Sequence, residues 1–210
     1  VLVIVLWNLA QQHSKLGDTR LTNAVERAAT VALPQQEGVR PTGDSVTTTL
    51  VAMLSDDESS DDIVALRLAS LDATKGTATL VDVPLDVSLG GKSVADAYAK
   101  GTDKLVSEFA KSAGLPVAHV VVVRQGTWDA LVATAAKGTS ALVKAAPDLM
   151  GGVVRSDMGA QDLLDLAKNA AKSKIGSAQQ ATVPTTTNDA GATVIDPVQL
   201  GLLVGTLAQG

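Results

Sequence analysis

The densest group of chemically active side chains is an acidic segment, SDDESSDD, at residues 55–62. Its five carboxylates are Asp56, Asp57, Glu58, Asp61 and Asp62. The segment directly follows an apolar, strand-like run, and ligand sites of α/β sheets lie where such strands end. Carboxylates at this density suit a hard cation such as Mg²⁺, which in turn binds a diphosphate. The alternative is a solvated acidic loop that holds no ligand.

A diphosphate site also needs positive groups, because carboxylates alone repel phosphate. Arg67 falls within an expected strand, Arg124 follows another, and Arg155 precedes an expected helix. No two arginines have the spacing of a bidentate phosphate clamp, and the glycine-rich phosphate-loop motifs do not occur. We therefore expect these arginines to be surface or salt-bridged side chains.

Histidine and cysteine chemistry is largely excluded. The chain has no Cys and only two histidines, His13 and His119. This composition excludes disulfides, thiolate metal sites and cysteine nucleophiles, and it provides no histidine cluster for zinc. His119 lies in a strongly apolar run, so we expect a core or edge histidine rather than a general base.

Nucleic acid is excluded as a partner by charge and composition. The formal net charge is −5, with 22 acidic residues against 17 basic ones. Nucleic-acid affinity depends on Lys and Arg neutralising phosphates, and single-strand binding uses aromatic stacking. Aromatic residues make up only 2% of this chain.

The elements that must position these side chains follow from the hydrophobic pattern. β-Branched and apolar runs predict strands at residues 46–54, 63–72, 77–86, 117–125, 179–186 and 191–196. Helical periodicity predicts helices at residues 8–33, 93–113 (broken at Gly101), 128–137 and 159–174, and after Asp196-Pro197. The alternation predicts an α/β fold: a mixed central β-sheet flanked by helices in a three-layer α-β-α sandwich.

The chain divides into three parts. Residues 1–7 hold an unbroken apolar run followed by Trp7, which predicts the end of a transmembrane anchor with an interfacial Trp. A buried or amphipathic N-terminal helix is the alternative, since a bilayer span needs about 20 apolar residues. Residues 8–44 read as an N-terminal helix and a linker, and residues 45–210 as the compact domain.

Between residues 50 and 131 the order of motifs resembles that of the LytR-CpsA-Psr family. The segments that carry the resemblance are LVAMLSDD, SSDDIVALRL, TATLVDVPLD, VADAYAKG and AGLPVAHVVVVRQGTWDALV. The later segments VVRSDMGAQDLLDLAK, ATVPTT and VIDPVQL resemble the tail that follows the core in this family. The resemblance implies a domain at the extracytoplasmic face of the cell membrane, anchored through its N-terminus.

The resemblance also implies a ligand and its site. Family members bind polyprenyl-phosphate-linked glycopolymers and transfer them to peptidoglycan, with Mg²⁺ on the diphosphate and arginines around it. By this resemblance, Asp56 and Asp61 would hold the metal, and Asp86 and Tyr98 would complete the binding site. The partners implied are a polyprenyl-phosphate lipid or a cell-wall glycopolymer. The aliphatic composition suits an apolar tunnel for the lipid chain between sheet and helices, although an ordinary core explains the same residues.

Several motif positions depart from the family. Ser59 and Leu85 stand where arginines are expected, and Ala95 where an Asn is expected. The Y-V-R-x-R and R-x-x-R-Q-Q segments find no counterpart, and no catalytic role is carried over to Arg155. Phosphoryl transfer depends on cations that neutralise developing charge. We therefore expect a non-catalytic binding or scaffold domain in cell-wall glycopolymer assembly, with an active phosphotransferase or a structural subunit of a membrane assembly as alternatives.

Overall fold

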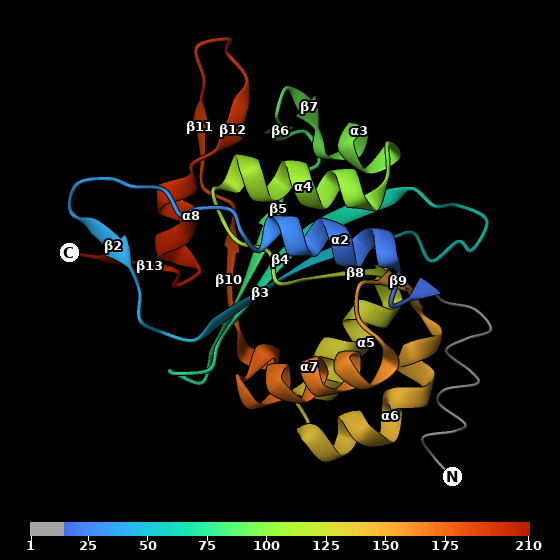
Figure 1. The fold of residues 1–210 in the computed structure, drawn as a ribbon. Coiled ribbons are helices and arrows are strands. Elements are labelled where there is room, and N and C mark those ends of the chain that lie inside the picture. Colours follow the sequence, from blue (N-terminus) through green and yellow to red (C-terminus); the bar gives the residue numbers. More distant parts are fainter. Residues whose placement is uncertain (1–14) are drawn as a thin grey trace.

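A mixed seven-stranded β-sheet lies between two layers of helices (Figure 1) in the computed structural model, which describes residues 15–210. In sheet order the strands are β1 (Lys15–Leu16), β9 (Val153–Ser156), β8 (His119–Arg124), β3 (Val46–Leu54), β4 (Ile63–Asp72), β5 (Thr77–Val83) and β10 (Gln179–Thr182). β3 pairs antiparallel with β4 and parallel with β8. The predicted three-layer α/β sandwich is confirmed.

The two helical layers bury separate hydrophobic cores. One face of the sheet is covered by α2 (Thr19–Ala28), α3 (Val94–Ala99), α4 (Thr102–Ala113) and α8 (Pro197–Leu203). The other face is covered by α5 (Gln125–Ala135), α6 (Thr139–Gly151) and α7 (Ala160–Lys172), with the short 3-10 helix η1 (Ile175–Ser177). Successive β3 residues alternate between the cores: Leu50 faces the first and Val51 the second. A strand that is buried on both faces has a nearly continuous apolar sequence. This is why β3 could be predicted from the sequence.

Two smaller sheets extend the packed body. One contains β11 (Thr185–Thr187), β12 (Thr193–Ile195), β6 (Ser88–Leu89) and β7 (Lys92–Ser93). The other pairs β2 (Val39–Pro41) with β13 (Leu207–Gln209). Residues 34–45, expected as a linker, thus include a strand, and Leu21 and Ala24 of α2 are fully packed into the first core. The core therefore extends N-terminal to Ser45, where the compact domain was expected to begin.

Local signals in the sequence fix several boundaries. Gly114 ends α4 in the left-handed conformation (φ 54°) that glycine adopts without strain. Asp196 caps α8 by accepting hydrogen bonds from the Val198 and Gln199 amides at 3.1 and 3.0 Å. Asp18 caps α2, which explains why this helix begins at Thr19. The expected helix over residues 8–14 lies outside the described residues.

Helix α6 and strand β9 were not predicted. Gly138 precedes α6 with φ 97°, and Pro147 lies inside the helix. Proline removes an amide donor and obstructs the preceding turn, so it normally marks a helix boundary. Because of these two residues, the sequence pattern predicted neither α6 nor the short strand that follows it.

The expected anchor at residues 1–7 also lies outside the described residues. Within residues 15–210, no helix combines the length and the hydropathy that crossing a bilayer requires.

Asp157 links strand β8 to the end of β9 through a buried carboxylate. Its Oδ1 accepts a hydrogen bond from the Val120 amide at 2.7 Å, and its Oδ2 lies 3.1 Å from His119 Nδ1. We predict that Asp157→Ala lowers the free energy of unfolding by about 1–3 kcal/mol, because the Val120 amide then lacks an acceptor. Urea denaturation measures this loss. The control is Asp165→Ala, whose exposed carboxylate should change stability by at most about 0.5 kcal/mol, and equal losses would contradict the prediction.

Candidate functional site

A cleft of about 850 Å³ opens on the α2–α4 face of the sheet. Its polar lining consists of Asp61, Asp62, Asp96, Tyr98, Thr102 and Arg155. Its apolar lining consists of Ile63, Ala95, Ala99, Val122 and Val154. The Asp61 side chain is 85% exposed, whereas Val122 is only 1% exposed. The cleft therefore has a charged rim and an apolar inner wall.

Tyr98 lines this cleft together with its charged groups. Helix α3 holds it in place, and that helix is capped by the Ser93 hydroxyl, which accepts the Asp96 amide at 3.0 Å. Partial burial raises the pKa of the Tyr98 phenol, and the nearby Asp61 carboxylate raises it further. The Arg155 and Arg124 guanidiniums and a hydrogen bond with Thr102 oppose this rise in pKa. The phenol is therefore neutral, and a hydrogen-bond donor, at physiological pH.

Arg155, which the sequence analysis considered but gave no role in the site, lines the cleft. The antiparallel register of β8 and β9 places it opposite Val122, on the inner wall. Its Nε lies 3.5 Å from Asp18 Oδ2, and Asp18 also caps α2 by accepting the Arg20 amide at 2.9 Å. The guanidinium is thus held at the cleft by the start of α2. The alternating pattern of VVRS could have indicated the strand, but no helix had been recognised before it.

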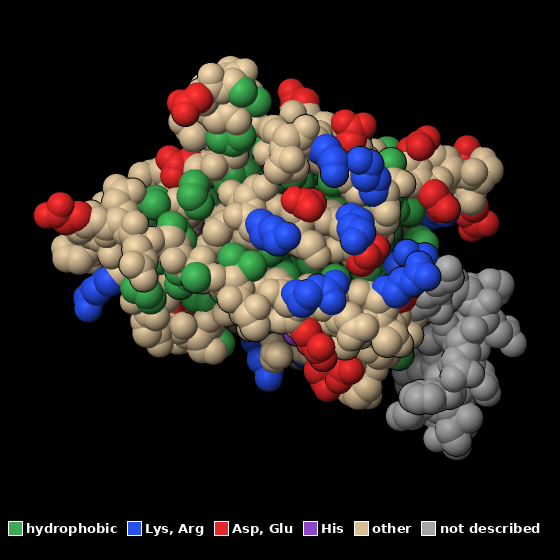
Figure 2. Space-filling model, turned by 45° about the horizontal axis from the view of Figure 1, so that its top comes forward, with side chains coloured by type: hydrophobic (Ala, Val, Ile, Leu, Met, Phe, Trp, Pro, Cys, Tyr) green, Lys and Arg blue, Asp and Glu red, His purple; other side chains and the backbone are tan. Residues whose placement is uncertain are grey.

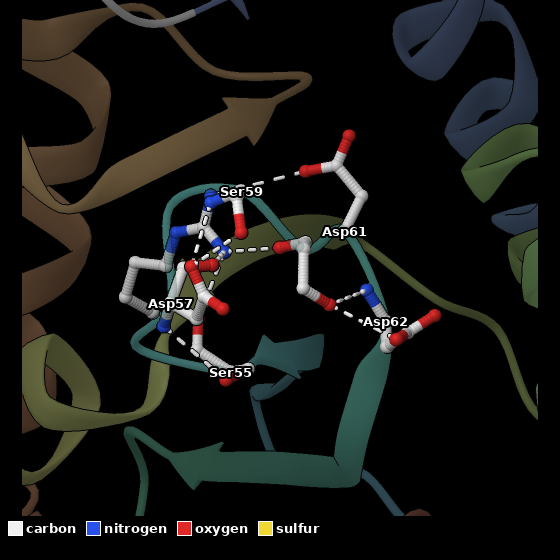
Figure 3. Close-up of polar contacts among 7 residues, drawn as sticks. Ser55, Asp57, Ser59, Asp61 and Asp62 are labelled. Carbon is white, nitrogen blue, oxygen red and sulfur yellow. Dashed lines mark hydrogen bonds and ion pairs between the residues drawn. The ribbon is translucent and has the colours of Figure 1, made fainter.

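Arg124 is the internal cation of the acidic loop. Its Nη1 donates hydrogen bonds to the backbone carbonyls of Ser55, Asp57 and Ser60 at 2.8, 3.1 and 2.7 Å. Its Nη2 lies 3.8 Å from Asp61 Oδ1 (Figure 3). The Arg124 side chain is only 16% exposed. These contacts occupy the guanidinium, so Arg124 shapes the loop instead of presenting a charge to a ligand.

Three more loop carboxylates make local contacts, two of which Figure 3 shows. Asp57 Oδ1 accepts the Ser59 amide and hydroxyl at 2.9 and 2.7 Å, and these bonds lower the pKa of Asp57. Asp62 Oδ2 accepts the Ser60 hydroxyl at 3.0 Å. Asp56 turns away and accepts the Gly126 amide in the first turn of α5 at 2.9 Å.

The structure brings together two of the four predicted site residues. Asp61 and Tyr98 both line the cleft, whereas Asp56 contacts the first turn of α5 and Asp86 is exposed between β5 and β6. Arg67 pairs with Asp82 at 2.5 Å. Because its neighbours on β4 face the first core, Arg67 lies on the opposite side of the sheet from the cleft.

The arrangement does not fit a preassembled Mg²⁺ site shared by Asp56 and Asp61. Asp56 is engaged with α5, and Asp61 is the nearest carboxylate to the Arg124 guanidinium. Across residues 15–210, no three Asp, Glu or His side chains gather closely enough to hold a metal ion. Mg²⁺ often takes one or two protein carboxylates and completes its shell with water and phosphate. Asp61 could supply one such ligand only beside a phosphate-bearing molecule.

An apolar cavity of about 90 Å³ lies on the opposite face, between the sheet and α5–α7. It is lined by aliphatic side chains, Trp128 and Thr49, whose hydroxyl is buried without a hydrogen-bond partner. A cavity of about 150 Å³ accepts one benzene molecule. This space is therefore too small for a long lipid chain, and the cleft is the better candidate.

Tyr98 is the sole tyrosine of the chain, so its ionisation can be followed by ultraviolet absorbance. We predict that Asp61→Asn lowers the pKa of Tyr98 and that Arg155→Ala raises it, because each variant removes a charge that acts on the phenol. Asp86→Asn serves as the control and should leave the titration unchanged. An unchanged titration in Asp61→Asn would show that Asp61 does not face the cleft.

The stabilisation of the acidic loop by the Arg124 hydrogen bonds is also testable. We predict that Arg124→Ala speeds amide hydrogen exchange in residues 55–62 and lowers the free energy of unfolding by about 1–3 kcal/mol, since three carbonyls lose a charged donor. Arg67→Ala, which breaks a partly exposed ion pair, should cost at most about 1 kcal/mol and leave loop exchange unchanged. Similar exchange in both variants would contradict this role.

The fold matches solved structures, although no protein-family model and no curated protein matches the sequence. A LytR-Csp2A-Psr enzyme from Actinomyces oris is 14% identical, with a TM-score of 0.51, over 86% of this chain and 100% of that one. B. subtilis TagV is 12% identical, with a TM-score of 0.54, over 79% and 96%. TagT, solved bound to LI-WTA, is 15% identical, with a TM-score of 0.50, over 84% and 100%. The resemblance to the LytR-CpsA-Psr family is thereby confirmed at the level of the fold.

Proposed function

We propose that this domain is a non-catalytic binding module of cell-wall glycopolymer assembly, which holds a phosphate-bearing polyprenyl lipid in the cleft. The observation that carries the proposal is the cleft's composition. Arg155 is the one arginine among its described lining residues, and it stands beside Tyr98 and an apolar wall. A single cation, a neutral phenol and aliphatic side chains are suited to a phosphate head with a hydrocarbon chain.

Each part of the cleft has a role in this binding. The Arg155 guanidinium offers a planar set of donors that matches two phosphate oxygens. Tyr98 adds a neutral donor, because its raised pKa keeps the phenol protonated. Val122, Val154 and Ile63 offer apolar surface to the first carbons of a prenyl chain.

The charge balance argues against transfer. Three carboxylates line the cleft, from Asp61, Asp62 and Asp96, and each repels a diphosphate. Arg124, at the end of the neighbouring strand β8, is engaged by backbone carbonyls. Loss of one stabilising donor typically lowers the rate of such reactions about 10²–10³-fold. A single guanidinium, itself paired with Asp18, therefore supports binding more readily than phosphoryl transfer.

The fold likeness gives the setting of this proposal. TagT shares the fold and was solved with LI-WTA bound. By analogy, the domain would act at the extracytoplasmic face of the cell membrane and be held there through its N-terminus. Fold analogy alone does not define a function, so the cleft's own chemistry must decide between binding and catalysis.

An active phosphotransferase is the second candidate. The observation in its favour is that Asp61 and Arg155, from distant parts of the sequence, line the same cleft. Such an enzyme would need further positive charge from a divalent ion carried in with the diphosphate.

Binding is measured with polyprenyl phosphate in detergent. We predict that Arg155→Ala weakens binding at least about tenfold, in line with a charged hydrogen bond of about 1.5–3 kcal/mol. Arg155→Lys should recover part of the affinity, since it restores the positive charge without the planar set of donors that a guanidinium presents. Arg67→Ala removes an arginine from the other face of the sheet and should bind like the native protein. Equal binding by native protein and Arg155→Ala would refute the assignment of the cleft.

The same samples separate binding from catalysis. Native protein with Mg²⁺ and a polyprenyl-diphosphate-linked sugar should show no cleavage of the pyrophosphate bond above background. Asp56→Ala should bind as the native protein does, because Asp56 lies outside the cleft. Cleavage that Asp61→Asn abolishes would instead establish the phosphotransferase.

A further inference from the structure

A cationic face covers the outer side of α2 and α4 and the ends of α3 (Figure 2). It is formed by Arg20 and Arg27 of α2, Lys104 and Lys111 of α4, and Lys92 and Lys100 on either side of α3. All six side chains are exposed. None of them forms an ion pair with any residue in the described part of the chain.

Helix geometry aligns these residues in rows. Arg20 and Arg27 are about two turns apart and therefore share one side of α2. Lys104 and Lys111 have the same spacing on α4, which packs beside α2. Lys92 and Lys100 lie so close together that the Lys92 ammonium lowers the pKa of Lys100. The rows thus place six cations on one face of the domain.

Four acidic residues of the same helices, Glu26, Asp96, Asp103 and Glu108, lie among the six cations, which remain in excess. Figure 2 shows Lys and Arg side chains spread across the face with isolated acidic side chains among them. Two of these carboxylates face local backbone: Glu108 lies beside Gly90, and Asp103 lies beside Gly101. The Asp96 carboxylate accepts the Ser93 hydroxyl at 2.8 Å.

The concentration of cations is notable because the chain as a whole is acidic, at −5. Charge separated in this way within one domain indicates an anionic partner on the positive side. Screening over about 8–10 Å weakens the effect of carboxylates on the far side of the domain. The aliphatic parts of Lys and Arg side chains are also long enough for the charged ends of these six residues to reach a flat partner surface together.

We propose that the cationic face docks on the surface of a membrane that contains anionic phospholipid. The sequence favours this occupant over a soluble polyanion, because α2 follows shortly after the apolar run at residues 1–6. Any bilayer contact made by that run brings α2 near the lipid headgroups. Docking through this face does not require a ligand in the cleft, so it stands or falls separately from the proposed function.

The test uses the full 210-residue chain and sedimentation with lipid vesicles. Vesicles of phosphatidylcholine alone are compared with vesicles that also contain phosphatidylglycerol, at low and high salt. The variant Arg27→Glu/Lys104→Glu/Lys111→Glu should partition at least about tenfold less into the anionic vesicles, because one cation near such a surface contributes about fivefold. Binding to neutral vesicles should not change, which separates the face from the apolar run.

The matched control is Lys137→Glu/Lys144→Glu/Lys172→Glu, which makes the same change in net charge on exposed residues around α5–α7. It should retain native partitioning, and circular dichroism should show both triple variants folded. Equal losses in the two variants would overturn the proposal, since net charge alone would then explain them. A cationic-face variant that loses affinity for soluble polyphosphate but not for anionic vesicles would also overturn it.

Discussion

The geometry of the candidate site depends on one interaction, the burial of the Arg124 guanidinium among the backbone carbonyls of the acidic loop. The loop leaves β3 with five carboxylates and would otherwise repel itself. A fixed cation at the end of β8 offsets that repulsion and ties the loop to the neighbouring strand. The position of Asp61 at the cleft rim follows from this anchoring. The acidic loop is therefore a structural unit with its own counter-ion.

The same interaction bears on the binding that we propose for the cleft. An arginine that completes a loop cannot also neutralise a ligand, so Arg155 is the one arginine left among the described residues that line the cleft. Asp18 reduces even that charge while it orients the guanidinium. In the proposed binding, shape and apolar contact therefore carry more of the affinity than charge. That balance favours retention of an amphiphile over stabilisation of a dissociating diphosphate.

Strong local patterns made most of the architecture predictable from sequence. The apolar run of β3, Gly114 and the Asp196-Pro197 pair each specify one conformation by their own chemistry. The site was only partly predictable, because its members meet through long-range pairing. Asp61 and Tyr98 were identified through the family resemblance, whereas Arg155 depends on the register between β8 and β9. Asp56 was misplaced because sequence proximity to Asp61 does not reveal that it turns toward Gly126.

The pairing of early and late segments has a consequence for the order in which this chain can fold. β1 pairs with β9, and β2 pairs with β13, so the first described strands find their partners far later in the sequence. Pairing across such sequence distance is intrinsically slow, because a large loop must close before any contact forms. β1 and β2 therefore stay unpaired until those later segments are in place, although α2, which lies between them, can already pack against α4.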